Sequence, residues 1–504
     1  MSKIEEPTIE VKLFVDKEKK KVLFAESDKE FVDVLFSFLT MPLGTIVRLM
    51  GKQSQIGCLD QIYKSVEDLS SDYFQTKACR TMLLAPLNAA SSHCSRLKIN
   101  VDDTKNREVY VCKDTGCCAH RAFSSVPDSA CKCGKLMESS GQSPDTIGEI
   151  ADGAGVFVNG CLKFITTDDF QVAPASTSLM MSLFEKLGVR DPANLEQKVL
   201  HLTSEKITGL LKRSLASKQP LTGLYFDDPM PYNDSSQCVL LPQNLNPETV
   251  TDNSDTLDNM KIRVVQMKNN STLLYAEAGN DFVDLFFGLL SIPLGSIIKS
   301  LDQRSSNGCL DNLYRSIDGS CKGCMISERQ SLLLAPTLAP FFGCCTSKIL
   351  QADESVPKEL NINVCFTCFK KCGFLDLRHC HEIPYNPYLR RCVSNCQETV
   401  KSTKLCELNP KSPNDGSENG EAYVKAGDMK FVVTNDLNVH PLSLSTTLQI
   451  VSDAKIEMEK LVEKEITLTK CQIMGLLRAV LMSRNALGSV LLPPKKKKLS
   501  HLRY

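Results

Sequence analysis

Two groups of cysteines are the residues of this chain best suited to chemistry. The first group lies in segment 109–137, VYVCKDTGCCAHRAFSSVPDSACKCGKLM, where two close thiol pairs are separated by a loop. Two such pairs can supply the four tetrahedral ligands of a closed zinc site, and the glycine after the last cysteine suits a turn whose N–H groups point at thiolate sulfur. The spacing departs from the usual two intervening residues, because the front pair encloses four residues and the back pair one. The pattern predicts that zinc binds Cys112, Cys117, Cys131 and Cys133.

The second group lies in segment 363–396, NVCFTCFKKCGFLDLRHCHEIPYNPYLRRCVSNC. Its front pair has the favoured two-residue spacing, so two sulfurs can reach one ion from an unstrained turn, and we expect this pair to matter more than Cys131 and Cys133. The predicted zinc ligands are Cys365, Cys368, Cys392 and Cys396, with Cys372, Cys380, His379 and His381 as spare candidates.

The alternative for both groups is a set of reduced thiols that bind no metal. Twelve of the 23 cysteines lie in the two groups if Cys406 is included, and core packing alone does not account for such clustering. The scattered thiols are interpreted instead as buried small apolar groups: Cys58, Cys79, Cys94, Cys309, Cys344 and Cys345.

Composition places these thiols in a reducing environment. No apolar run is long enough to span a bilayer, and the N-terminal segment lacks the apolar stretch of a signal peptide. We therefore expect a soluble intracellular protein, cytoplasmic or nuclear, whose cysteines are thiols or metal ligands more often than disulfides. Basic and acidic residues number 59 each, so a broad surface for phosphate backbones is not indicated. Lys495–Lys498 lie in a basic tail, 493–504, which we interpret as a solvated terminus, with an import signal as the alternative.

Internal repetition organises the rest of the chain. KVLFAESDKEFVDVLFSFLTMPLGTIVRLM, at 21–50, returns as TLLYAEAGNDFVDLFFGLLSIPLGSIIKSL at 272–301. GCLDQIYKSV returns as GCLDNLYRSI, LLAP appears twice, and ITGLLKRSL matches IMGLLRAVL, all in the same order. The repetition predicts two tandem copies of one unit. The first copy covers 10–226 with its cysteine-rich insert at about 109–137, a linker covers 227–260, and the second copy covers 261–492 with its insert at about 363–396.

Local patterns predict mixed strands and helices in each copy. Val11–Val15 and Val22–Ala25 flank a charged turn and predict a hairpin. A helix follows, with Ser27 as the expected N-cap, Glu30 completing a capping box, and Pro42 ending the helix. Further along, the pattern predicts a hairpin that turns near Asn159-Gly160, a helix at 176–187, a strand at 198–202 and a helix at 204–217. Because the elements lack a regular βαβ alternation, the fold class is α+β, with a zinc-ribbon-like insert in each unit.

The motif string carries a family resemblance over nearly the whole chain. LFAE, FVDVLFSFLTMPLGTIVRL, GCLDQIYKSV, LLAP, the cysteine-paired insert, FITTDDFQVAPAS and LLKRSLASKQPLT resemble the plant family catalogued as domain of unknown function 674. The resemblance implies plant origin, tandem copies and no established activity. Members often carry two Cys-x-x-Cys-like pairs in the insert, which supports the two ligand sets, although this chain departs from that spacing at its two back pairs.

Catalytic patterns are not found in the sequence. There are seven histidines, and no nucleophile elbow, His-Glu-x-x-His or phosphate-binding glycine loop is present. Acidic residues recur in both copies, and solvated or capping roles are expected for them: Asp33 with Asp284, Asp60 with Asp311, and Asp169 with Asp436.

We therefore expect a non-enzymatic interaction or scaffold protein with structural zinc and an unidentified protein partner. One alternative is nucleic-acid binding through the inserts and the lysine tail, where Tyr385, Tyr388, Arg390 and Arg391 come closest to a basic and aromatic pattern. A second alternative is an enzyme with an unrecognised site. The sequence does not determine the oligomeric state.

We predict that freshly isolated protein contains no intrachain disulfide, because the best-spaced thiols suit a metal rather than crosslinks. The measurement is intact mass after alkylation under non-reducing conditions. Each disulfide would prevent alkylation of two cysteines and lower the mass of the protein by two protons. Native protein with such a mass deficit would contradict the prediction.

Overall fold

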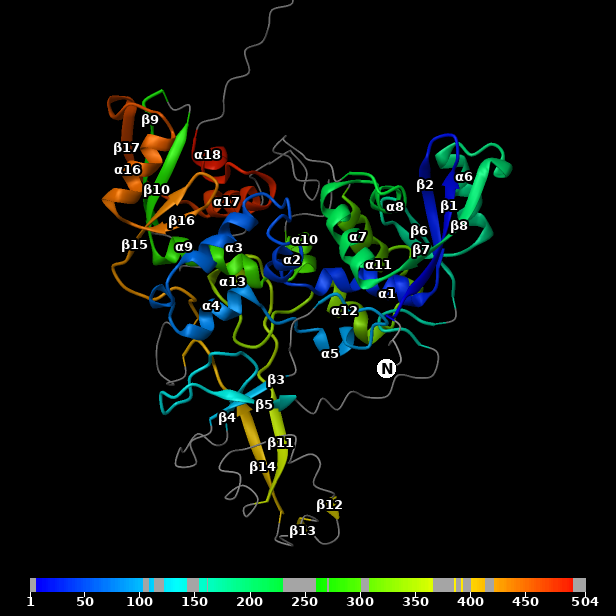
Figure 1. Ribbon diagram of the computed structural model, residues 1–504, viewed down its shortest axis with the longest axis horizontal. Coiled ribbons are helices and arrows are strands. Elements are labelled where there is room, and N and C mark those ends of the chain that lie inside the picture. Colours follow the sequence, from blue (N-terminus) through cyan, green and yellow to red (C-terminus); the bar gives the residue numbers. More distant parts are fainter. Residues whose placement is uncertain are drawn as a thin grey trace, which may run out of the picture.

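Three five-stranded sheets organise the chain (Figure 1). The computed structural model describes residues 6–102, 108–112, 122–142, 154–160, 162–229, 260–269, 272–300, 308–365, 385–386, 391–392, 400–412 and 421–492. Two of the sheets form separate lobes, and the third projects from the body between them (Figure 1). The mixed α+β class predicted from the sequence is confirmed.

The first sheet is antiparallel and is formed by the first half of the chain. Its strand order is β7-β6-β2-β1-β8. Residues 9, 11, 13 and 15 of β1 are buried and alternate with more exposed positions, so this strand places one face on the core. The strands are β1 (Ile9–Asp16), β2 (Lys21–Ser27), β6 (Phe164–Thr167), β7 (Val172–Pro174) and β8 (Leu195–Leu202).

The second sheet is formed by the second half and has the corresponding order, β16-β15-β10-β9-β17. Its strands are β9 (Lys261–Met267), β10 (Leu273–Gly279), β15 (Lys430–Thr434), β16 (Val439–Pro441) and β17 (Leu461–Thr467). The matching order is what two copies of one unit require. The exact boundaries 10–226 and 261–492 remain predictions, and most of the linker 227–260 lies outside the described residues.

Corresponding helices accompany the two sheets. The first half has α1 (Lys29–Ser37), the 3-10 turn η1 (Phe38–Thr40), α5 (Ser91–Cys94), α6 (Thr177–Leu187), α7 (Ser204–Ala216) and α8 (Pro220–Tyr225). The second half has α9 (Asn280–Phe287), η5 (Gly288–Ser291), α13 (Cys345–Ile349), α16 (Leu444–Asp453), α17 (Lys470–Met482) and α18 (Ala486–Leu491). Short 3-10 turns lie at η2 (Ser71–Tyr73), η3 (Pro192–Asn194), η6 (Lys322–Cys324) and η7 (Met458–Lys460).

The remaining helices are exchanged between the halves. Helices α2 (Leu43–Leu49), α3 (Leu59–Asp68) and α4 (Lys77–Leu84) belong to the first half by sequence. In Figure 1, α3 and α4 (blue) lie beside the second-half sheet. Their counterparts α10 (Leu294–Ser300), α11 (Cys309–Asp318) and α12 (Ser327–Leu334) lie beside the helices and sheet of the first half. Each lobe therefore contains helices from both halves.

Hydrogen bonds confirm the exchange at both ends of α3 and α11. The Cys58 thiol at the start of α3 donates to the Ser483 carbonyl at 2.9 Å, and the equivalent Cys309 thiol donates to the Ser217 carbonyl at 3.2 Å. Near the other end, the Ser65 hydroxyl accepts the Val439 N–H at 2.8 Å. The corresponding Ser316 hydroxyl accepts the Val172 N–H at 3.0 Å.

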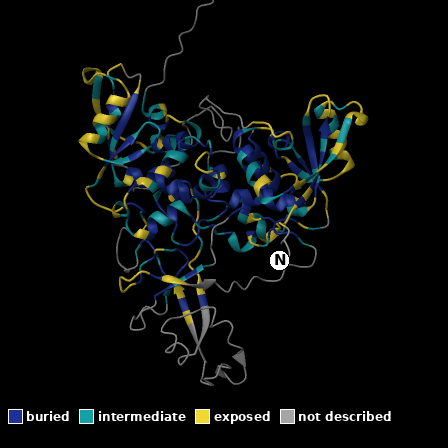
Figure 2. Ribbon diagram, viewed as in Figure 1, coloured by how far each residue is buried: buried dark blue, intermediate teal, exposed yellow. Residues whose placement is uncertain are grey.

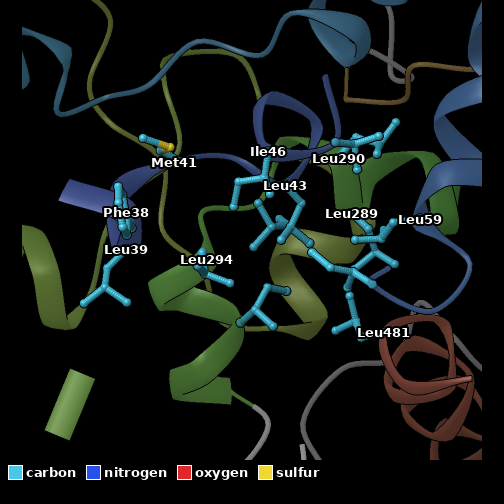
Figure 3. Packing of buried hydrophobic residues seen from close by; sticks show 14 of the residues in the cluster. Phe38, Leu39, Met41, Leu43, Ile46, Leu59, Leu289, Leu290, Leu294 and Leu481 are labelled. Carbon is cyan, nitrogen blue, oxygen red and sulfur yellow. The ribbon is translucent and has the colours of Figure 1, made fainter. Parts of the chain in front are cut away.

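One continuous apolar core fills both lobes. The cluster of buried residues includes α1 and α2 from the first half together with α9, α10 and α17 from the second. Figure 3 shows its centre, where Leu43 and Ile46 lie close to Leu289, Leu290 and Leu294. The exchanged helices thus join the two halves in one shared core (Figure 2).

Buried aspartates fix the segments that follow each insert. Asp33, 2 % exposed, accepts the backbone N–H groups of Val156, Phe157 and Val158 at 2.5, 2.7 and 3.1 Å. Its counterpart Asp284 accepts the N–H groups of two residues, at 2.7 and 2.9 Å, in the segment 423–424. The solvated or capping role expected for this pair is wrong, because the returning segments cover helix positions that would otherwise face water.

The segments held by these aspartates also contact the exchanged helices. Phe157 accepts the N–H of Ile326 at 2.9 Å, and Tyr423 accepts the N–H of Gln75 at 2.8 Å. Each buried carboxylate thus organises a loop of its own half, and that loop binds the exchanged segment of the other half. A carboxylate that accepts several N–H groups in this way stabilises irregular backbone that neither helix nor sheet can satisfy.

Lys411 is a buried cation near Asp284. Its ammonium donates to the carbonyls of Gly343 and Glu421, both at 2.7 Å, and lies 3.7 Å from the centre of the Tyr423 ring. Burial lowers the pKa of Lys411, while nearby Cys344, Cys79 and Asp284 oppose that shift. The two carbonyls and the ring replace the water that the ammonium loses.

Local elements agree with the sequence analysis except at two points. The hairpin of β1 and β2, the helix α6 with Ser176 as its N-cap, the strand β8 and the helix α7 are confirmed. Ser27 is not the N-cap of α1, since the strand β2 continues through it and the cap position falls at Asp28. The turn of the later hairpin lies at 168–171 rather than at Asn159-Gly160, because Val158 forms a bridge with Met325 of the exchanged segment.

We predict that Asp33→Asn lowers the free energy of unfolding by about 1–3 kcal/mol, because an amide presents N–H donors where the carboxylate accepts them. Burial raises the pKa of Asp33 from 3.8 to about 6. An acid with a raised folded-state pKa stabilises the fold when protonated, and this contribution is lost as the pH rises from about 4 through about 6. The wild type's advantage over the variant should therefore shrink between about pH 4 and about pH 6 in urea unfolding.

Asp28→Asn is the matched control, because Asp28 is exposed and forms a surface ion pair with Lys163. Such pairs contribute little, so the control should change stability by less than about 1 kcal/mol. A difference between wild type and Asp33→Asn that widens as the pH rises would contradict the assignment.

Candidate metal centre

The third sheet combines both cysteine-rich inserts. Its order is β11-β14-β4-β3-β5. The first insert contributes β3 (Glu108–Val111), β4 (Ala122–Ser124) and β5 (Glu138–Gln142), and the second contributes β11 (Glu359–Cys365) and β14 (Val400–Glu407). The inserts meet where β14 pairs with β4 in parallel, with Cys406 opposite Ala122. Strands from the two cysteine-rich regions thus complete a single sheet, and the zinc-ribbon-like character expected of each insert stays a prediction.

Glu407 and Leu408 fasten the junction between the inserts. The Glu407 carboxylate accepts the Ser125 hydroxyl at 2.5 Å and the Lys358 N–H at 2.8 Å. The next residue, Leu408, donates its N–H to the Phe123 carbonyl at 2.7 Å. Burial raises the pKa of Glu407, so its hydrogen bonds replace water that the carboxylate has lost.

Three cysteines of the first insert converge beside this junction. Cys112 follows the end of β3, and Cys131 and Cys133 lie on the turn that leads toward β5. The three Sγ atoms all lie within 4.8 Å of one another, and those of Cys112 and Cys133 are 3.7 Å apart. Tetrahedral zinc with Zn–S bonds near 2.3 Å separates its sulfur ligands by about 3.8 Å, so this spacing fits the metal.

A tight turn brings Cys131 and Cys133 together despite their short spacing. The Gly134 N–H donates to the Cys131 carbonyl, and the Cys131 N–H donates to the Lys135 carbonyl, both at 2.8 Å. Gly134 has a φ of 82°, a left-handed conformation that glycine adopts without strain. One intervening residue is therefore sufficient here, because the turn curls the backbone around the thiols.

The triad is partly buried. Cys112 is 4 % exposed and Cys131 is 1 % exposed, whereas Cys133 is exposed. The two buried thiols pack against Met137 and against Leu408, which comes from the second half. A metal bound here would therefore stabilise the first insert at the place where it contacts the second.

The structure brings together three of the eight predicted ligands. Cys117 lies outside the described residues, as do Cys368 and Cys396. Cys365 and Cys392 belong to strands β11 and β13 (Arg391–Cys392), the latter paired with β12 (Tyr385–Asn386), but their side chains lie outside the description. The predicted site of the second insert thus stays a prediction.

Most thiols elsewhere are buried, as predicted. Cys58, Cys79, Cys94, Cys309 and Cys344 are buried, while Cys345 is only partly covered. Burial raises the pKa of Cys58 and Cys94 to about 12, so these thiols are poor nucleophiles at neutral pH.

One cysteine pair was missed in the sequence analysis. Cys321 and Cys324 have two-residue spacing, visible in the sequence as CKGC, and both are buried at the turn η6. Burial raises the pKa of Cys321 to about 12, and its thiol donates to the Val172 carbonyl at 3.3 Å. This pair is placed in the contact between halves and not in an open site.

The other recurring carboxylates hold loops. Asp60 accepts the Ser54 N–H and hydroxyl at 3.1 and 2.8 Å, and Asp169 accepts the Thr167 hydroxyl at 2.5 Å within its turn. Asp436 repeats that turn contact with Thr434 at 2.5 Å. Asp169 also accepts the side-chain amide of Asn312 from the other half at 3.1 Å, so its role is not only local. Asp311 is buried, contrary to the expectation of solvation.

The chain belongs to the family described as protein of unknown function (DUF674), whose model matches residues 5–471 and, in a second overlapping match, 365–503. Neither the curated proteins nor the solved structures compared with the chain gave a match. Among the described residues, no helix is long and apolar enough to cross a membrane.

We predict that zinc protects Cys133 from alkylation and leaves Cys406 reactive. Both thiols are exposed, but only Cys133 lies in the triad. The measurement is peptide mass spectrometry after brief alkylation with and without added zinc, with buried Cys94 as the unreactive reference. Equal protection of Cys133 and Cys406 would contradict metal binding at the triad.

Proposed function

We propose that the protein is a non-enzymatic interaction protein in which zinc stabilises the third sheet. The observation that carries this proposal is the convergence of the Cys112, Cys131 and Cys133 sulfurs within 4.8 Å. Cys117, from the same insert, is the proposed fourth ligand. Four cysteine ligands form a closed site, which is the arrangement of structural rather than catalytic zinc.

The small core of the third sheet supports a structural role for the metal. Among the side chains that the structure describes, the apolar cluster between its strands consists of Val109, Val111, Phe123, Leu360 and Leu405. A core of this size supplies little stability by itself, and small folds of this kind commonly depend on a metal. Zinc would hold the end of β3 to the turn at 131–134 and so support the surface on which Leu408 packs.

The position of the third sheet supports an interaction role. The sheet projects from the body that contains the continuous core (Figure 2). Strands β5 and β11 are its terminal strands, and an edge strand can pair with an extended segment of a partner protein. The proposed partner is therefore a protein. The basic and aromatic side chains that suggested nucleic-acid binding, those of Tyr385, Tyr388, Arg390 and Arg391, lie outside the description.

Chemistry in the described residues also points away from catalysis by thiols. The buried cysteines outside the triad have raised pKa values, and the buried aspartates are occupied by backbone N–H groups. Groups of this kind hold structure, whereas a catalytic acid, base or nucleophile needs access to a substrate.

Metal content per chain, measured after purification without added metal, tests the proposal. We predict that Cys112→Ser loses one equivalent of zinc relative to wild type, because structural zinc depends on every thiolate ligand. Cys406→Ser is the matched control, since Cys406 is exposed in the same sheet and lies outside the triad. The control should keep the wild-type zinc content.

Limited proteolysis of the same proteins gives a second readout. Cys112→Ser, or wild type with chelator, should be cut faster at 108–142 while the body stays intact, since the body has its own core. Zinc-free wild type, or identical zinc content and digestion in both variants, would refute the proposal.

A further inference from the structure

The centre of the molecule is a self-complementary contact between the halves. The Leu43 N–H donates to the Ile292 carbonyl at 3.0 Å, and the Leu294 N–H donates to the Met41 carbonyl at 2.9 Å. Between these bonds, Pro42 lies opposite Pro293 in an antiparallel bridge. Leu43 corresponds to Leu294 in the repeat, and Ile292 corresponds to Met41, so the two bonds are one contact made once in each direction. A twofold dimer interface has this pattern.

The same reciprocity extends to the glycines beside this bridge. A Cβ on Gly44 would lie 3.0 Å from the Leu290 carbonyl oxygen of the other half and 2.9 Å from the Leu83 carbonyl oxygen of its own. A Cβ on Gly295 would lie 3.0 Å from the Leu39 carbonyl oxygen of the other half and 3.0 Å from the Leu333 carbonyl oxygen of its own. Glycine at both positions lets the two backbones approach closely. The close approach is required twice because the contact is made twice, once in each direction.

A further reciprocal contact lies between the second and third exchanged helices of each half. Phe74 forms a bridge with Val424, and Met325 forms a bridge with Val158. Flanking bonds run from the Lys425 N–H to the Tyr73 carbonyl at 2.9 Å and from the Asn159 N–H to the Cys324 carbonyl at 2.8 Å. The exchanged segments are therefore bound at their beginning, along α3 and α11, and at the turns that precede α4 and α12.

The apolar faces of the exchanged helices depend on the other half for cover. Leu59, Ile62 and Val66 of α3 are fully buried. Helix α3 packs against α9 and β16 of the second half as well as against α2 and α4 of its own. The counterpart α11 packs against α1, α7 and β7 of the first half. A half without its partner would expose both the helix face and the surface that receives the partner's helix.

We infer that the partner of each half is a second copy of the same unit. The chain is then a dimer of two covalently linked units, and the linker between them is not needed for the units to assemble. The reciprocal contacts, the exchanged helices and the shared core form an interface that holds separate polypeptides together. Reciprocal exchange of an element between identical units is a known route to dimers.

A cut in the full-length chain tests this inference. A protease site is inserted between residues 240 and 245, and the purified protein is then cleaved under native conditions. The two fragments should elute together at the mass of the uncut chain. The Tm of the cut protein should rise with protein concentration, because its unfolding separates two molecules, whereas the Tm of the uncut chain should not. Separation into two folded species, aggregation on cleavage, or a concentration-independent Tm for the cut protein would overturn the inference.

Variants at the central contact localise the interface. Gly44→Ala and Gly295→Ala should each weaken association of the cut fragments by roughly tenfold or more, the scale of an overpacked contact. Gly323→Ala is the matched control, because Gly323 lies in the exchanged segment and an added Cβ there meets nothing within 4 Å. The control pair should associate like wild type. Equal weakening by all three substitutions would also overturn the assignment of this contact as the interface.

Discussion

The antiparallel crossing at Pro42 and Pro293 is the contact on which the arrangement of the molecule depends. Each chain segment leaves the lobe of its own sheet there and delivers three helices to the other lobe. A proline at the crossing cannot donate a backbone hydrogen bond, and in the bridge this costs nothing, because the flanking Leu43 and Leu294 make the bonds. In both copies the PLG and GCLD motifs lie at contacts that the structure makes twice.

Buried aspartates stabilise the exchange of helices at positions away from the crossing of Pro42 and Pro293. Asp33 and Asp284 lie on helices just before the crossing segments, yet their carboxylates hold the loops that receive the exchanged segment of the other half. Burying a charge is costly unless hydrogen bonds replace the lost water, so each aspartate demands a fully formed loop around it. The requirement links three parts of the fold: the helix, the returning loop and the exchanged segment. Lys411 adds a similar requirement in the second half through two carbonyls and the Tyr423 ring.

The third sheet extends the same principle of shared construction to the inserts. Neither insert supplies enough strands for a five-stranded sheet, and the parallel pairing of β4 with β14 combines them. The triad lies at the edge of this junction, where Leu408 of one insert covers Cys112 and Cys131 of the other. A metal bound at that point would stabilise both inserts. Cysteines of the first half alone would then support a surface to which both halves contribute.

The sequence by itself determined the elements whose causes are local. Alternating apolar residues predict β1, the local pattern predicts the helix α6 at 176–187, and the repeated motifs predict two copies of one unit, which agrees with two sheets of the same strand order. Cysteine spacing also singled out Cys112, Cys131 and Cys133, with Cys117, as candidate ligands, and the structure places the sulfurs of the first three within 4.8 Å of one another.

Only the tertiary structure decided against which half of the chain each helix packs. The apolar stripe of α3 has the same period whether it packs on its own sheet or on the other, so no local pattern distinguishes the two. Asp33 looked solvated for a similar reason, because the loop at 156–158 that covers it lies more than a hundred residues away in the chain. The joining of the two inserts depends on backbone hydrogen bonds between β4 and β14, and backbone groups are the same in every residue. Local chemistry therefore fixed the elements, while long-range packing fixed which elements contact one another.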